Sequence, residues 1–93
     1  MIGMLLYDDV QGRFIVQELI KNVITEDSRI VELCCGTQLA IRLAQDNWKE
    51  TQIEKDSEDD LYGWYFVGLG RAAPLVGYTV MLTAFLALTK APW

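Results

Sequence analysis

Short runs in which apolar and polar residues alternate, separated by polar or glycine-containing turns, dominate this sequence. Alternation with a period of two is typical of β-strands that bury one face. The segments predicted to be strands are residues 4–7, 13–16, 39–43, 48–55, 63–68 and 78–82. Short strands with regularly spaced turns predict a mainly β fold, here a small five- to six-stranded half-open barrel.

Two segments depart from this pattern. Within residues 17–24 the apolar positions repeat every three or four residues, which is helical spacing, although many of these residues are β-branched. For residues 17–24 we therefore consider two alternatives, a short helix and a strand. We expect one β-barrel domain over residues 1–82, followed by an apolar tail over residues 83–93 that can form a second short helix.

An uncharged stretch of eighteen residues lies between Arg71 and Lys90. This length touches the lower limit for a membrane-spanning helix. Pro74 and Gly77 interrupt the stretch, and its strongly apolar part, residues 80–88, is about half of the ~20 residues that a span requires. A buried strand followed by a short apolar helix is the favoured interpretation, and a small membrane-associated protein is the alternative.

The composition excludes several classes of function. Thirteen acidic and eight basic residues give a net charge of −5, which disfavours direct nucleic-acid binding because counterion release requires a basic surface. The chain contains no histidine, so it cannot form a Ser-His-Asp or Cys-His catalytic site or a histidine-containing zinc site. We therefore predict that the protein is not an enzyme and needs no cofactor or metal.

The two cysteines, Cys34 and Cys35, are adjacent. Neighbouring cysteines rarely reach disulfide geometry without strain, so both are predicted to be free thiols, buried in a β-turn. Free thiols indicate a reducing compartment, and the amino terminus lacks the basic region of a signal peptide. The expected location is the cytoplasm.

An acidic run and a group of aromatic residues are the candidate interaction features. The acidic run next to Lys55 is either a solvated hairpin tip or a contact site for a basic partner. Most aromatic rings are expected in the core, with Trp64 and Phe66 on one strand face and Tyr65 and Val67 on the other. The candidate interaction residues are Asp56, Glu58, Asp59, Asp60, Trp48, Tyr62 and Tyr65.

The pattern W-x-x-T-x-I-E-x-D, beginning at Trp48, precedes G-W-Y-x-V-G, beginning at Gly63. Together with the segments around residues 6–14 and 32–41, it resembles a family of small uncharacterised proteins from mobile elements and phages of Gram-positive bacteria. The similarity covers residues 4–82. It implies a β-barrel like that of the Src-homology-3 domain, and it assigns no activity and no functional residues.

These observations predict a small non-enzymatic binding module of mobile-element type that acts by protein–protein interaction. The alternative is an acidic inhibitor whose carboxylates mimic phosphates in the basic groove of a host nuclease, such as a CRISPR effector. The expected partner is a protein, including a basic nucleic-acid-binding protein, and the C-terminal tail is a candidate contact for homo-oligomers.

Overall fold

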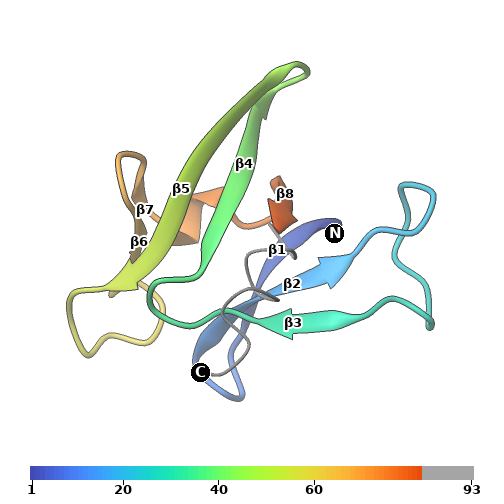
Figure 1. The fold of residues 1–93 in the computed structure, drawn as a ribbon. Coiled ribbons are helices and arrows are strands. Elements are labelled where there is room, and N and C mark those ends of the chain that lie inside the picture. The colour runs from blue at the N-terminus through green and yellow to red at the C-terminus, as the bar shows by residue number, and fades with distance from the viewer. Residues whose placement is uncertain (83–93) are drawn as a thin grey trace, which may run out of the picture.

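The computed structural model describes residues 1–82, which form one antiparallel sheet (Figure 1). The strands are β1 (Ile2–Asp8), β2 (Arg13–Glu18), β3 (Ile30–Glu32), β4 (Gln38–Ala44), β5 (Asn47–Lys55), β6 (Trp64–Phe66), β7 (Gly70–Arg71) and β8 (Thr79–Leu82). A 3-10 turn, η1 (Ala73–Leu75), precedes β8. The strand order is β3-β2-β1-β8-β4-β5-β6-β7, so β8 joins the N-terminal hairpin to the central one.

The mainly β prediction is confirmed, and every segment predicted to be a strand contains one. The predicted number of five to six strands is wrong, because the described residues form eight. The additional strands, β3 and β7, have three and two residues, too few for alternation to be recognised. They occupy the two edges of the sheet and do not pair with each other, so the sheet is open.

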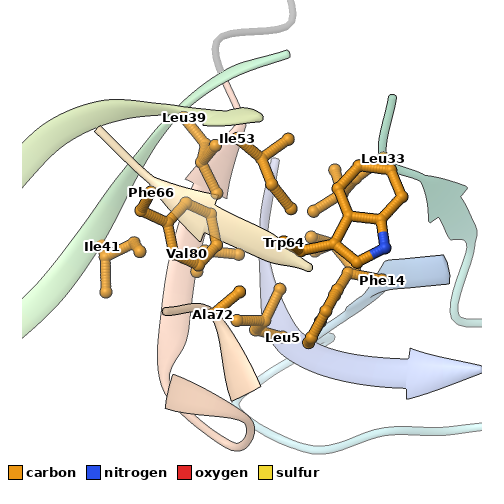
Figure 2. Packing of buried hydrophobic residues seen from close by; sticks show 11 residues of the cluster. Leu5, Phe14, Leu33, Leu39, Ile41, Ile53, Trp64, Phe66, Ala72 and Val80 are labelled. Atoms are coloured by element: carbon orange, nitrogen blue, oxygen red, sulfur yellow. The ribbon is translucent and has the colours of Figure 1, made fainter. Parts of the chain in front are cut away.

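The sheet is strongly bent and encloses the core on its concave face (Figure 2). Phe14 on β2 and Trp64 on β6 belong to strands far apart in the sheet order, yet their ring centroids are 6.3 Å apart in an edge-to-face contact. The core consists of Leu5, Phe14, Val16, Leu33, Leu39, Ile41, Ile53, Trp64, Phe66, Ala72 and Val80. The bend thus lets an open sheet bury its apolar face against itself.

The predicted alternation of β6 is confirmed. Trp64 and Phe66 are buried, whereas Tyr65 is half-buried and Val67 is exposed. The uncharged stretch after Arg71 contains η1 and β8 in its described part, which confirms the expected strand. No helix within residues 1–82 combines the length and apolar character needed to cross a bilayer.

The helix considered for residues 17–24 is wrong. Strand β2 continues to Glu18, and the chain then forms a β-bridge between Ile20 and Val23. Between them, Lys21 and Asn22 have φ angles of 52° and 68°, the left-handed values that a two-residue hairpin turn requires. The helical spacing fails as a signal because Val23 and Ile24 are exposed, so no helical face packs against the core. We call residues 19–29, which connect β2 to β3, the arm.

The prediction for the two cysteines is confirmed in one respect and wrong in another. Both thiols are free, as predicted, and the amide of Thr37 closes a turn on the carbonyl of Cys34 at 3.0 Å. However, Cys34 and Cys35 are exposed, because Leu33 takes the adjacent core position and the turn projects into solvent. The predicted tail and C-terminal helix, residues 83–93, lie outside the described residues.

Candidate functional site

The acidic run forms the loop between β5 and β6 and lies beside the turn between β1 and β2. The two segments approach closely at Gly12, where an added Cβ would lie 2.9 Å from Cγ of Asp60. Gly12 has a φ of 67°, so a side chain there would also be strained. This approach brings together residues about fifty positions apart in the sequence. We call Tyr7, Asp8, Asp9, Asp59 and Asp60 the acidic surface.

Tyr7 lies among the carboxylates of this surface. Its ring packs edge-to-face on Phe14, with the ring centroids 5.0 Å apart. Partial burial, followed by the negative charges of Asp60, Asp59, Asp9 and Asp8, raises the pKa of Tyr7. The phenol is therefore neutral at physiological pH and can donate a hydrogen bond within an otherwise acidic surface.

Asp56, the first residue of the acidic run, is paired with Arg71 on β7. The guanidinium donates two hydrogen bonds to the carboxylate, of 2.7 and 2.6 Å, and a third of 3.1 Å to the carbonyl of Tyr62. These bonds lower the pKa of Asp56, and the guanidinium carbon lies 5.6 Å from the ring centroid of Tyr65. Asp56 therefore links the loop to the edge strand, and its charge is compensated.

Asp59 shapes the loop itself. Its Oδ1 accepts hydrogen bonds from the amides of Leu61 and Tyr62, at 2.9 and 2.6 Å. Gly63 completes the turn, since an added Cβ would lie 2.4 Å from the carbonyl oxygen of Asp59 and 2.6 Å from that of Ser57. The backbone at Gly63 is thus packed against the backbone of Ser57 and Asp59, and no side chain larger than hydrogen fits at this position.

The remaining candidates in the loop, Glu58, Asp60 and Tyr62, are exposed to solvent. The Lys55 ammonium lies 3.5 Å from Oδ1 of Asp60 and 5.3 Å from the ring centroid of Trp64. Glu58 is exposed and forms no hydrogen bond or ion pair with any other described residue. The side chain of Tyr62 is 60% exposed, which makes it the most accessible aromatic residue of the described chain.

Trp48 is not part of this site. It lies near the β4–β5 turn, opposite Arg42, at the other end of β5 from Asp56. The two positions are eight residues apart along the chain, or about 26 Å at ~3.3 Å per residue. The structure therefore brings together every sequence-predicted site residue except Trp48.

Sequence reasoning missed Tyr7, Asp8, Asp9 and Arg71 as members of this region. The adjacent acids Asp8 and Asp9 were visible in the sequence, but nothing in the sequence linked them to the acidic run. Their proximity depends on the bend of the sheet, which no local pattern encodes. Among residues 1–82 there is no cluster of three or more histidine, cysteine or carboxylate side chains placed to hold a metal ion.

A comparison with curated proteins gave no match, and a comparison with solved structures gave none. Residues 3–82, which run from β1 to the end of β8, match the family described as a domain of unknown function, DUF5348, and the chain therefore belongs to this family.

Proposed function

We propose that the protein is a non-enzymatic binding module that contacts a basic protein partner through its acidic surface. The observation that carries this proposal is the approach of two acidic segments, in which Asp60 lies against Gly12 of the β1–β2 turn. Partial burial and then the carboxylates of both segments raise the pKa of Tyr7, which agrees with this geometry. Carboxylates gathered from separate parts of the chain create a local negative potential that attracts a cationic surface.

Neighbouring residues support a protein as the partner. Tyr62 offers an exposed aromatic ring beside the carboxylates, and tyrosine is enriched at protein interfaces because it combines apolar area with a polar hydroxyl. Glu58 adds a carboxylate that is not compensated by any cation of the described residues. A net charge of −5 argues against nucleic acid as the direct ligand.

The absence of enzymatic activity is part of the same proposal. Acid–base catalysis relies on titratable groups whose pKa values are shifted by desolvation in a cleft. No polar or charged side chain within residues 1–82 is buried, and the chain has no histidine. The exposed free thiols of Cys34 and Cys35 support a reducing, cytoplasmic location.

We also propose that the fold is a variant of the half-open barrel of Src-homology-3 type and that the protein has a mobile-element origin. The bend that brings Phe14 against Trp64 supports the first point. The W-x-x-T-x-I-E-x-D and G-W-Y-x-V-G motifs, which resemble those of mobile-element proteins, support the second.

The binding proposal is tested by capture experiments with the full chain as bait, using an extract of the organism that encodes it. The double charge reversal D9K/E58K changes Asp9 of the acidic surface and Glu58, the exposed loop residue that precedes Asp59. The control E26K/D27K makes the same change in net charge on the exposed arm. We expect the wild type and the control to retain the same basic protein, and D9K/E58K to lose it. Equal capture by both variants would contradict the proposal.

The phosphate-mimicking inhibitor is the second candidate. It is favoured by Asp9, an exposed carboxylate that acts on Tyr7 together with Asp59 and Asp60 and has no hydrogen bond or ion pair to another described residue. An inhibitor of this kind occupies the nucleic-acid groove of its partner, so duplex DNA should displace it in competition. If DNA binds the captured partner, for example a nuclease, without displacing the protein, phosphate mimicry is excluded while partner binding is retained.

A further inference from the structure

The outer, convex face of the sheet carries a second set of apolar side chains. On each strand the residues alternate between the two faces, and Leu5, Val16 and Val80 point into the core. Their neighbours along the strands therefore lie on the opposite face. The apolar residues at these outer positions of β1, β2, β3 and β8 are Ile2, Met4, Leu6, Ile15, Ile30 and Met81. We call them the outer apolar face.

The strand register places these residues next to one another. Leu6 is paired with Ile15 across β1 and β2, and Ile2 is paired with Met81 across β1 and β8. Ile30 is paired with Gln17, whose other partner is Met4. The outer apolar face is therefore contiguous over β8, β1 and β2, and Gln17 separates Met4 from Ile30 on the edge strand β3.

None of these side chains belongs to the core or packs against it within the described chain. Ile2 and Ile30 are 43% and 58% exposed, and Met4, Leu6, Ile15 and Met81 are half-buried. A contiguous apolar patch exposed to water is unusual for a monomeric protein and marks a surface that another segment or molecule covers.

The residues after Leu82 begin at this surface. β8 lies next to β1, and the amide of Leu82 donates a 2.8 Å hydrogen bond to the carbonyl of Met1. The chain therefore leaves β8 beside Ile2, at one end of the outer apolar face. The sequence that follows, TAFLALTKAPW, contains a run of five apolar residues from Ala84 to Leu88 and a single charged side chain, Lys90.

The length of this segment fits the width of the face. Residues 83–93 span about 16 Å as a helix, at ~1.5 Å per residue, and about twice that when extended. From β8 to β3 there are three strand-to-strand steps, or about 14 Å at ~4.8 Å per step. Either conformation reaches from the end of β8 across to β3.

We propose that residues 83–93 fold back across the sheet and cover the outer apolar face. Its apolar run then packs on side chains such as Leu6 and Ile15, and the covered face is not available to a second copy of the chain. This inference does not depend on the proposed function, because it involves neither the acidic surface nor its partner.

The test uses the full chain and two variants with equal changes in charge. F85D/L88D removes apolar contacts from the segment, whereas T83D/T89D leaves the apolar run intact. We expect F85D/L88D to shift the backbone amide resonances of Leu6, Ile15 and Ile30 and to accelerate their hydrogen exchange. T83D/T89D should leave these amides close to their wild-type values. Shifts confined in both variants to the residues next to Leu82 and beyond would overturn the proposal.

A second measurement on the wild-type chain holds even if a variant fails to fold. Nuclear Overhauser contacts between the side chains of Phe85, Leu86 or Leu88 and those of Leu6 or Ile15 are expected within one molecule, independent of protein concentration. Contacts seen only between differently labelled molecules in a mixed sample would replace the proposal with a dimer. A complete lack of such contacts would refute it.

Discussion

The β5–β6 loop and the arm lie on opposite sides of the molecule and are built with similar polar contacts (Figure 1). Each is joined by an arginine–carboxylate pair, Arg71 with Asp56 in the loop and Arg29 with Glu18 in the arm. The two segments differ in their contact with the hydrophobic core. Leu61 of the loop packs against the core, whereas Val23 at the tip of the arm is 54% exposed.

The loop and the arm therefore share surface ion pairing, and only the loop also contacts the core. Exposed ion pairs contribute little to folding free energy, because solvent and salt screen them. The packing of Leu61 against the core and the close approach of the backbone at Gly63 connect the loop energetically to the whole sheet. The arm is connected mainly by backbone hydrogen bonds, so changes in it should remain local.

The largest effect is expected for Phe14→Ala, which removes the ring that bridges the two halves of the bent sheet. Phe14 is fully buried and contacts both Tyr7 and Trp64. Its truncation should lower the free energy of unfolding by about 3–5 kcal/mol, as measured by urea denaturation. Val10→Ala is the control, because Val10 is 91% exposed and the change should stay within about 0.5 kcal/mol. Similar losses for both variants would mean that the core does not hold the sheet halves together.

The second largest loss of stability is expected for a substitution in the β5–β6 loop. Gly63→Ala places a Cβ against two backbone carbonyls and should destabilise the whole domain by about 1–3 kcal/mol, with loss of the native loop. Gly68→Ala is the matched control. It has a φ of 79° but open space around the position, so only the backbone strain of about 1 kcal/mol applies. Thermal unfolding of the two variants checks the order, and a milder effect at Gly63 would contradict the close packing of the loop.

A smaller and more local effect is expected in the arm. Asn22→Val places a β-branched residue at a φ of 68°, which should cost about 1–2 kcal/mol at the turn. Asn22→Gly keeps the left-handed conformation accessible and should be nearly neutral. Hydrogen exchange should show faster opening of residues 19–29 in Asn22→Val and little change at Phe66. Equal acceleration at Phe66 would show that the arm and the core unfold together.

The smallest effect is expected for the dependence of folding stability on acidic pH. The hydrogen bonds from Arg71 and Arg29 lower the pKa values of Asp56 and Glu18 in the folded state. The unfolded chain therefore binds more protons in the acidic range, and stability should decrease as the pH falls through the folded pKa values. Asp56→Asn should flatten this decrease, as should high salt.

The control for the acid response is Asp46→Asn in the β4–β5 turn, where the carboxylate forms no ion pair with another described residue. Denaturation curves recorded across the acidic range should keep the wild-type pH dependence in this variant. If Asp56→Asn and Asp46→Asn behave alike, the pairing of Asp56 with Arg71 makes no measurable contribution to stability.

Much of the sheet could be predicted because its hairpins carry their own signals. Leu39 and Ile41, two residues apart in β4, and Ile53, between polar neighbours in β5, identify both strands and their buried face. In the arm, the spacing of Ile20, Val23 and Ile24 suggested a helix, and the structure contains a turn instead. The spacing of apolar residues therefore predicts a helix or strand correctly only where the apolar face packs against the core.

The candidate site was predictable only in part, for a related reason. The acidic run and Tyr62 stand out in the sequence, and the structure places them together at one end of β5 and β6. The pairing of Asp56 with Arg71 and the approach of Asp60 to Gly12 join residues that are distant in the sequence. Trp48 was grouped with them by residue type, but the length of β5 separates it from the loop.

The amino-acid sequence by itself determined six of the eight strands, the face that most of them bury, the unpaired thiols and the acidic character of the protein. These properties follow from side-chain chemistry and from the two-residue repeat of a strand, and both act locally. The tertiary structure alone decided that the sheet bends without closing, that two acidic segments share one surface, and that one set of apolar residues remains outside the core. Bending and packing sum interactions over the whole sheet, and Phe14 meets Trp64 only after the strands between them are in place.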